Sequence, residues 1–204
     1  MPGPAVRILV VAALSILALV GLVVRESIER RDGAEVILRM EAVDPRALLT
    51  GHYVSVSLRE ALSPGVACPP GTDVSDTTGH SAEERTAWIA LARRGDHASV
   101  AGQTETRAEA LRLAPLAVRG GALCQAATAP SGDEPGRPGF VTLDVGVDRF
   151  HVSQSEAERI DTLLAGRRTG EEGPVSAIVS IGRDGRARLK GLVVEGRRLE
   201  LSLL

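Results

Sequence analysis

An uninterrupted apolar run near the N-terminus constrains this chain more than any other feature. Residues 8–24 read ILVVAALSILALVGLVV and include no charged residue. As a helix rising about 1.5 Å per residue, the run is roughly 25 Å long, which is the short end of a membrane crossing. Arg7 and Arg25 flank the run, and their side chains can snorkel to extend its reach. The run predicts a single uncleaved transmembrane helix in contact with the lipid bilayer.

Two other interpretations of the run stay open. One is a buried core helix, although the run has no polar face. The other is a cleaved signal peptide, although no A-x-A site precedes Arg25 and Glu26. The predicted division of the chain is a tail over 1–7, a transmembrane helix over 8–24, a juxtamembrane linker over 25–33 and one β-rich domain over 34–204.

The side of the membrane on which the domain lies is not fixed by charge alone. Arg7 precedes the run, whereas Arg25, Arg30 and Arg31 follow it. This count of positive residues favours a cytoplasmic domain. The cysteines, Cys68 and Cys124, are compatible with one disulfide in an oxidising compartment, and two unpaired thiols are the alternative.

Short β patterns fill the domain that follows. Alternation and β-branched content predict strands at 34–40, 52–59, 86–93, 97–103, 140–147, 175–181, 187–194 and 198–203. Residues 116–118 and 122–125 predict one further strand, interrupted at Gly120 and Gly121, and residues 149–152 either continue the strand at 140–147 or pair beside it. Asp184 and Gly185 between two such runs are the strongest hairpin signal in the chain. The predicted fold class is an N-terminal transmembrane helix followed by a β-rich, mainly antiparallel α+β domain with one short helix.

The helical signals in the domain are few. Ser155 and Glu158 fit a capping box, which predicts a helix over 156–164. Residues 104–113 are compatible with either a short helix or a charged loop.

The sequence contains no recognised catalytic, metal-binding or nucleotide-binding motif. His52, His80, His97 and His151 have no spacing that suits zinc, and GxSxG, HExxH and P-loop patterns are absent. A net charge of −2 and an aromatic content of 2% argue against a nucleic-acid partner. We therefore expect no cofactor and no metal.

One stretch resembles type I signal peptidases, which also have an N-terminal span and an exported β-rich domain. PRALLTGH, from Pro45 to His52, is similar to their Pro-x-Leu-x-x-Gly-Asp stretch. Their serine would fall at Ala42, and the only lysine, Lys190, is far along the chain. A serine–lysine mechanism needs both groups in contact. The resemblance therefore implies at most a related scaffold that lacks the catalytic serine.

A second resemblance covers nearly the whole chain. The stretch GHYVSVSL, which begins at Gly51, is similar to the motif of the GDYXXLXY family of bacterial membrane-anchored proteins. Gly51 and Tyr53 match the motif. His52, Val56 and Leu58 stand where the family has aspartate, leucine and tyrosine. These departures favour a structural role for the motif, with Gly51 in a turn and Tyr53 filling the domain.

Two further segments carry the family resemblance. Asp44, Pro45 and Arg46 belong to a lead-in like that of the family, and Phe150 and His151 belong to a second family segment, DRFHV. The hairpin over 175–194 resembles the family's terminal hairpin. The resemblance implies an extracytoplasmic domain, a multi-pass membrane protein as partner, and no assigned activity. We give this topology more weight than the arginine count.

Three functions are compatible with these observations. The first is a non-enzymatic accessory protein that docks on an integral-membrane partner, with Arg46 as an expected polar contact. The second is a module that binds a small ligand or an envelope component in a pocket lined by His52, Tyr53 and His151. The third is a hydrolase whose catalytic groups the sequence does not reveal.

Overall fold

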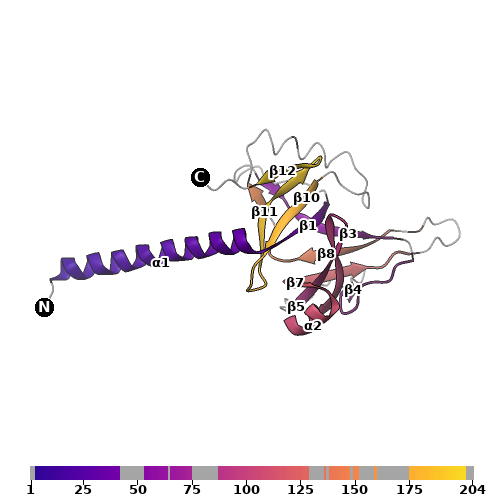
Figure 1. Ribbon diagram of the computed structural model, residues 1–204, viewed down its shortest axis with the longest axis horizontal. Helices are drawn as coiled ribbons and strands as arrows, with labels where there is room; N and C mark the ends of the chain where they lie inside the picture. The colour runs from indigo at the N-terminus through magenta and orange to yellow at the C-terminus, as the bar shows by residue number, and fades with distance from the viewer. Residues whose placement is uncertain are drawn as a thin grey trace.

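A long N-terminal helix projects from a β domain in the computed structural model of the chain (Figure 1). The structure describes residues 3–41, 53–63, 65–74, 87–128, 136, 138–147, 149–151, 159 and 175–200. Helix α1 (Pro4–Asp32) continues past the predicted span, so the predicted linker at 25–33 is helical as far as Asp32. Among the described residues, α1 alone is long and apolar enough to cross a membrane. Its apolar window is 0% buried, which excludes a core helix.

The two ends of α1 follow from local sequence. Pro4 occupies the first turn, where its missing N–H costs no hydrogen bond. Arg30 and Arg31 lie in the last turn, beside the negative end of the helix dipole. Gly33 then adopts an extended conformation and leads directly into the first strand.

The domain is built on a ten-stranded sheet and a separate two-stranded sheet. The strands are β1 (Ala34–Glu41), β2 (Tyr53–Ser55), β3 (Ser57–Leu62), β4 (Asp73–Val74), β5 (Ala87–Arg94), β6 (His97–Thr104), β7 (Leu116–Gln125), β8 (Gly139–Asp144), β9 (Arg149–His151), β10 (Val175–Ile181), β11 (Ala187–Val194) and β12 (Arg197–Glu200). The large sheet has the order β12-β11-β10-β1-β3-β8-β7-β5-β6, and β4 pairs with β7 in parallel. The other pairings are antiparallel, which confirms the predicted fold class.

Two long strands fold the sheet on itself by changing partners along their length. The first part of β1 pairs with β10, and its end, at Met40 and Glu41, pairs with β3. Likewise β7 pairs with β5 before Gly121 and with β8 from there onward. The sheet therefore curls until β6 packs against β1. At this seam Arg93 Nη2 donates a hydrogen bond to the carbonyl of Glu35 at 3.0 Å.

Several predicted strands have a different extent in the structure, and the one predicted over 140–147 ends, as β8, at Asp144. The strand predicted over 116–118 and 122–125, with an interruption at Gly120 and Gly121, is continuous in the structure as β7. Gly120, with φ of 153°, lies within the strand, and the position requires glycine because a side chain there would collide with the carbonyl of Asp144. Conversely, the strand predicted at 52–59 divides at Val56 into β2 and β3, which belong to different sheets.

Helix α2 (Arg107–Leu113) occupies the stretch that the sequence left open. Thr106 caps it by accepting a hydrogen bond from the Glu109 N–H at 3.3 Å, and its hydroxyl donates to the Glu109 carboxylate at 2.7 Å. Ala110 is fully buried and packs in an alanine cluster with Ala90 and Ala117. The helix predicted over 156–164 lies outside the described residues apart from Arg159, which is helical.

One apolar core joins the strands of the curled sheet. Its largest fully buried side chains include Leu58, Ile89, Leu91, Ile178 and Leu192. Strand β10 has the predicted bounds and is buried along its whole length. Because both faces of β10 are buried, the hydroxyl groups of its two serines need hydrogen-bond partners on neighbouring elements.

Candidate functional site

The end of α1 meets the β10–β11 hairpin in an ionic contact centred on the buried side chain of Arg188. The side chain of Arg188 is only 8% exposed. Its Nε donates to Glu26 Oε1 at 2.6 Å, and its Nη1 and Nη2 donate to the two carboxylate oxygens of Asp184 at 3.1 and 3.0 Å. A planar guanidinium fork suits this arrangement because it binds two carboxylates in fixed directions. We name these three residues the junction triad.

Backbone contacts bring the hairpin against the helix around the triad. The Ser180 hydroxyl donates to the carbonyl of Glu29 at 3.3 Å, and the Arg183 N–H donates to the Glu29 carboxylate at 3.3 Å. Gly33 and Gly182 allow this approach, since a side chain on either would collide with the facing element. The hydroxyl group of Ser180, in the buried strand β10, therefore has its hydrogen-bond partner on the helix.

Hydrogen bonding between Arg188 and Asp184 favours the charged forms of these two groups. Hydrogen bonds from Arg188 lower the pKa of Asp184 to about 2, and the same contacts raise the pKa of Arg188. Next to the triad, Lys190 and Arg198 bind Glu35 at 2.8 and 2.7 Å. Hydrogen bonding from Lys190 is the main cause that lowers the pKa of Glu35.

The tip of the same hairpin also contacts the far side of the domain. Gly185, with φ of 78°, accepts a hydrogen bond from the Arg119 N–H at 2.8 Å, and it packs on the ring of Trp88. The guanidinium groups of Arg119 and Arg107 lie 5.1 and 5.8 Å from the centre of that ring. The hairpin therefore connects α1 to strands β5 and β7, which are remote from it in sequence.

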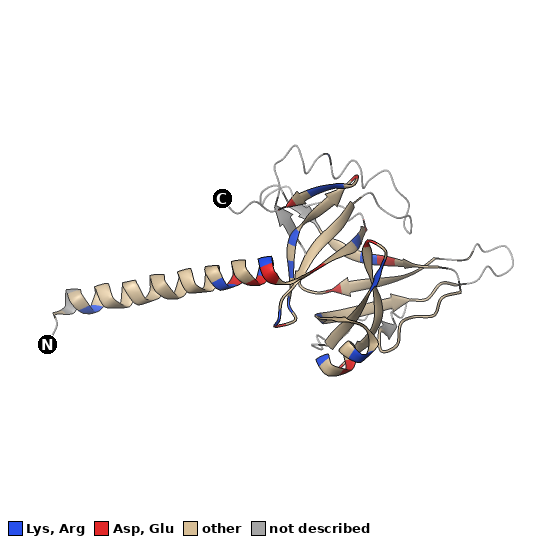
Figure 2. Cartoon of the chain, in the orientation of Figure 1, with Lys and Arg blue, Asp and Glu red and all other residues tan. Residues whose placement is uncertain are grey.

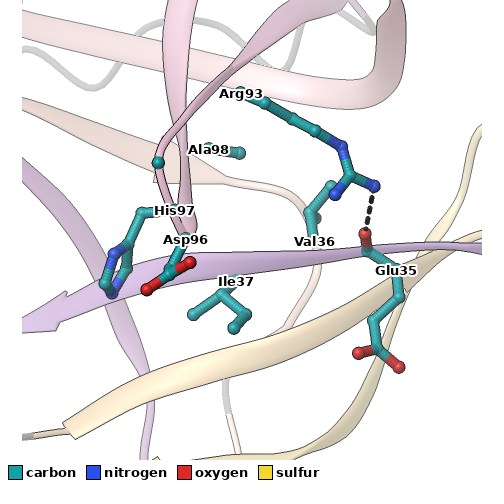
Figure 3. Close-up of a pocket in the computed structure, with 8 residues that line it drawn as sticks. Glu35, Val36, Ile37, Arg93, Asp96, His97 and Ala98 are labelled. Carbon is teal, nitrogen blue, oxygen red and sulfur yellow. Dashed lines mark hydrogen bonds between the residues drawn. The ribbon is translucent and has the colours of Figure 1, made fainter.

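A small polar pocket lies at the seam between β1 and β6 (Figure 3). Its volume is about 90 Å³, well below the ~300–1,000 Å³ of typical ligand pockets. Its polar lining includes Asp96, His97 and Arg93, which reaches across to the main chain of Glu35. His97 Nε2 lies 3.1 Å from Ser176 Oγ, so the other serine of β10 is satisfied by this histidine.

A serine beside a histidine is also the beginning of a nucleophilic site. Ser176 is 6% exposed, however, and it does not line the pocket. Within the described residues no group orients the second nitrogen of His97, and no group of three or more metal ligands is present.

Farther along the seam, Glu60 of β3 accepts a hydrogen bond from the Val100 N–H of β6 at 2.9 Å. Burial raises the pKa of this carboxyl group. Because this hydrogen bond links two strands of the curled sheet, Glu60 has a structural role in the observed arrangement.

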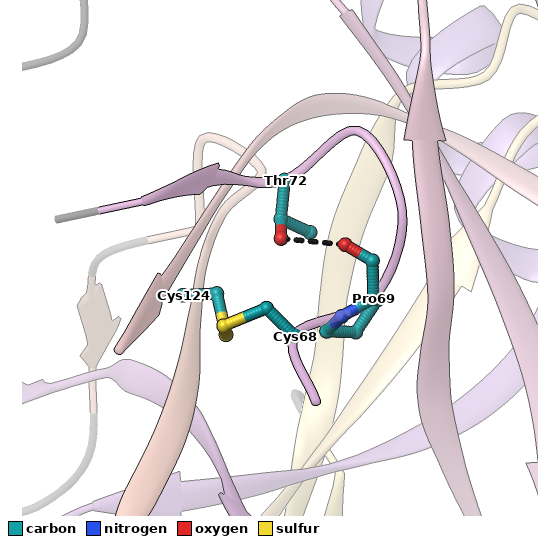
Figure 4. The surroundings of a disulfide bond; sticks show 4 residues. All are labelled: Cys68, Pro69, Thr72 and Cys124. Atoms are coloured by element: carbon teal, nitrogen blue, oxygen red, sulfur yellow. Dashed lines mark hydrogen bonds between the residues drawn. A yellow bond between two sulfur atoms is a disulfide. The ribbon is translucent and has the colours of Figure 1, made fainter. Parts of the chain in front are cut away.

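A disulfide joins Cys68 to Cys124 and holds the segment after β3 against β7 (Figure 4). The Cα atoms are 5.8 Å apart, and the sequence separation is 56 residues. Thr72 closes the adjacent turn by donating to the carbonyl of Pro69 at 2.7 Å. Both cysteines are thus used in the fold, and the described chain has no free thiol.

The sequence-predicted site residues are only partly described. Asp44, Pro45, Arg46, Gly51 and His52 lie outside the described residues.

The other predicted positions are brought together by the two-stranded sheet. Tyr53 in β2 is opposite His151 in β9, and Val54 is opposite Phe150. The two family segments, predicted separately, are therefore paired backbone to backbone. A pocket formed by the side chains of His52, Tyr53 and His151 stays a prediction.

Sequence reasoning did not identify the junction triad. Asp184 was assigned only to a turn, and Glu26 and Arg188 had no assigned role. The spacing of Asp184 and Arg188 across a predicted hairpin is a weak signal for an ion pair. Nothing local in the sequence pointed to Glu26, since it lies 162 residues from Arg188.

Comparison with known proteins places these features in a family. No curated protein and no solved structure matches the chain. The family model described as "GDYXXLXY protein" matches residues 15–192, a range that includes most of α1, both paired motif segments and the hairpin that carries Arg188. The chain belongs to the GDYXXLXY protein family.

Proposed function

We propose that the chain is a membrane-anchored, non-enzymatic accessory protein whose β domain docks on an integral-membrane partner outside the cytoplasm. In this proposal α1 crosses the bilayer through residues 8–24, and residues 34–204 form the extracytoplasmic domain. Residues 25–32 become a helical stalk in place of a flexible linker.

The junction triad is the observation that carries the proposal. A domain on a loose tether needs no specific contact with its anchor. Here Arg188 has a defined hydrogen-bond geometry to the helix and to the hairpin turn, at 8% exposure. Directional charged contacts of this kind fix orientation as well as distance. A fixed orientation suits a domain that presents one face to a partner in the same membrane.

The disulfide supports the extracytoplasmic side. Structural disulfides persist in oxidising compartments and are rare in the cytosol. The segment closed by Cys68 and Cys124 is long, so the bond makes a substantial contribution to folding. The arginines after the run favour the opposite side, and we give the disulfide and the family resemblance more weight.

A tagged pull-down of the full-length chain from its native membranes in mild detergent, read by mass spectrometry, tests docking. The expected result is a multi-pass membrane protein in near-stoichiometric amount. The variant Arg188→Met should stay in the membrane but recover less partner, whereas the surface variant Arg197→Met should recover the wild-type amount. Recovery of the chain alone, under conditions that keep known complexes intact, would contradict the docking proposal.

Anchoring and sidedness need a separate measurement. Intact mass of the membrane-extracted chain should include residues 8–24, and a mass that begins after them would indicate a cleaved signal peptide. A membrane-impermeant maleimide, added to intact cells after reduction, should label Cys68, which is partly exposed, whereas Cys124 is fully buried. Labelling only after the cells are opened would place the domain in the cytoplasm.

A hydrolase is the second candidate, because Ser176 lies in hydrogen-bond contact with His97 beside a polar pocket. A fluorophosphonate probe should label Ser176 in the full-length chain if this pair is nucleophilic. Labelling should then disappear in Ser176→Ala and in His97→Gln. Absence of labelling in wild type, with a known serine hydrolase labelled in parallel, would leave the pair as a structural contact.

A further inference from the structure

We propose that the β10–β11 hairpin and the end of α1 form a basic collar that contacts anionic lipid headgroups. The basic collar consists of Arg25, Arg31, Arg119, Arg183 and Arg186. The inference rests on the proposed membrane anchor and adds a second, electrostatic contact between the domain and the bilayer. Figure 2 shows basic residues, interspersed with acidic ones, on the last turns of α1, and further charged residues on the hairpin beside it.

The first argument is the height of the hairpin above the membrane. Arg183 N–H contacts the Glu29 carboxylate, and Arg188 contacts Glu26. Glu29 follows Val24, the last apolar residue of the run, by about 7 Å along the helix axis. The headgroup layer is itself roughly 5–7 Å thick on each side of the hydrocarbon core. The tip of the hairpin therefore lies at the outer edge of that layer, within reach of an arginine side chain.

The second argument is the distribution of charge. All five collar residues are exposed, and within the described part of the chain none of them forms an ion pair. The nearby carboxylates of Glu26 and Asp184 are both occupied by Arg188, which is buried. Arg188 thus offsets part of the negative charge that would otherwise repel an anionic surface. The five collar arginines outnumber the four nearby carboxylates, those of Glu26, Glu29, Asp32 and Asp184, so the net charge around the collar is positive.

The third argument is the single tryptophan beside the hairpin tip. Trp88 packs against Gly185, and the backbone of Arg119 is fixed to Gly185 at 2.8 Å. Tryptophan and arginine together are typical of surfaces at the membrane–water interface. Basic side chains near an anionic surface gain about fivefold in affinity each, and this attraction extends over a Debye length of about 8 Å.

Trp88 is the chain's only tryptophan and provides a native reporter. The experiment uses the full-length chain in nanodiscs of phosphatidylcholine, with or without 30% phosphatidylglycerol. Quenching of Trp88 fluorescence by a lipid spin-labelled on its headgroup measures approach of the hairpin to the surface. We expect at least twofold stronger quenching with the anionic lipid, and loss of most of that difference in 0.5 M salt.

Variants separate the collar from general charge effects. Arg183→Glu combined with Arg186→Glu should abolish the lipid-dependent difference, and replacement of both residues by lysine should retain it. Arg197→Glu is the matched control, because Arg197 is an exposed arginine on β12 outside the collar. Equal acrylamide quenching of all variants in neutral detergent verifies that the surroundings of Trp88 are unchanged.

The outcomes distinguish the collar from the anchor. A chain that fails to integrate into nanodiscs overturns the anchor and the collar together. A chain that integrates but shows equal quenching with both lipids overturns only the collar. The collar is also overturned if Arg197→Glu abolishes the difference as fully as the hairpin variants do.

Discussion

The two ends of the β domain are held by different kinds of interaction. At the anchor end, α1 meets β10 and β11 through ion pairs and polar hydrogen bonds centred on Arg188. At the distal end, a disulfide joins Cys68 to β7, and a buried alanine cluster supports α2. The anchor end fixes the orientation of a helix whose own surface is apolar and exposed. The distal end fixes the fold of the chain.

The difference follows from what each end has to pack against. The last turns of α1 carry charged residues, so a protein surface can hold them only with complementary charge and hydrogen bonds. The distal segments present apolar and small side chains, which can be buried. We therefore expect the distal end to respond to redox conditions and the anchor end to respond to acid.

The largest expected effect is at the distal end. Replacing both Cys68 and Cys124 by alanine should lower the free energy of unfolding by about 4 kcal/mol, because the disulfide closes a long loop in the unfolded chain. The measurement is urea unfolding of the full-length chain in mild detergent, followed by Trp88 fluorescence. Reduced wild type should match the double variant. A loss below about 1 kcal/mol would mean that the apolar core alone holds this end.

Gly185→Val tests the hairpin tip that connects the two ends. It should cost about 3 kcal/mol, since valine must adopt a positive φ and also collides with Trp88. Gly196→Val is a matched control, because Gly196 has the same φ of 78° but open space around it. The excess cost of the first variant measures packing on Trp88. Equal costs would show that the tip does not depend on the ring.

Arg188→Met should cost about 2 kcal/mol at neutral pH. The expected loss lies below that of a fully buried pair, since Glu26 is 53% exposed and can be solvated when its partner is removed. The control Arg198→Met removes a 45% exposed arginine that pairs with Glu35 and Glu200 at the surface, and it should cost under about 0.5 kcal/mol. If the two variants lose the same amount, the triad is no more than a surface contact.

The smallest expected effect is the acid response of the anchor end. The pKa of Asp184 is about 2 in the folded chain and near 3.9 when unfolded. Folding therefore favours the ionised form of the Asp184 carboxylate. The contribution of this carboxylate to the free energy of unfolding is present above pH 4 and disappears as pH falls toward 2. The expected loss is about 1–2 kcal/mol. Asp184→Asn should remove this dependence, and an unchanged pH profile in that variant would assign it to other groups.

The sequence predicted elements whose signals are local. The apolar run, the β10–β11 hairpin with Asp184 and Gly185, and the bounds of β10 each follow from a continuous pattern of side chains. The segments around Tyr53 and His151 were each identified by their resemblance to the family. Their pairing as β2 and β9 was not predicted, because strand pairing between distant segments leaves no periodic signal in either one.

What the sequence determined by itself is that an apolar helix precedes a β-rich domain of this family, since hydrophobic periodicity and turn chemistry act over a few residues. The tertiary structure alone decided that β1 and β7 change partners and that Glu26 meets Arg188 across 162 residues. Such contacts depend on the path of the whole chain. A charged residue has the same identity whether it is solvated or buried against a partner, so only the fold distinguishes the two.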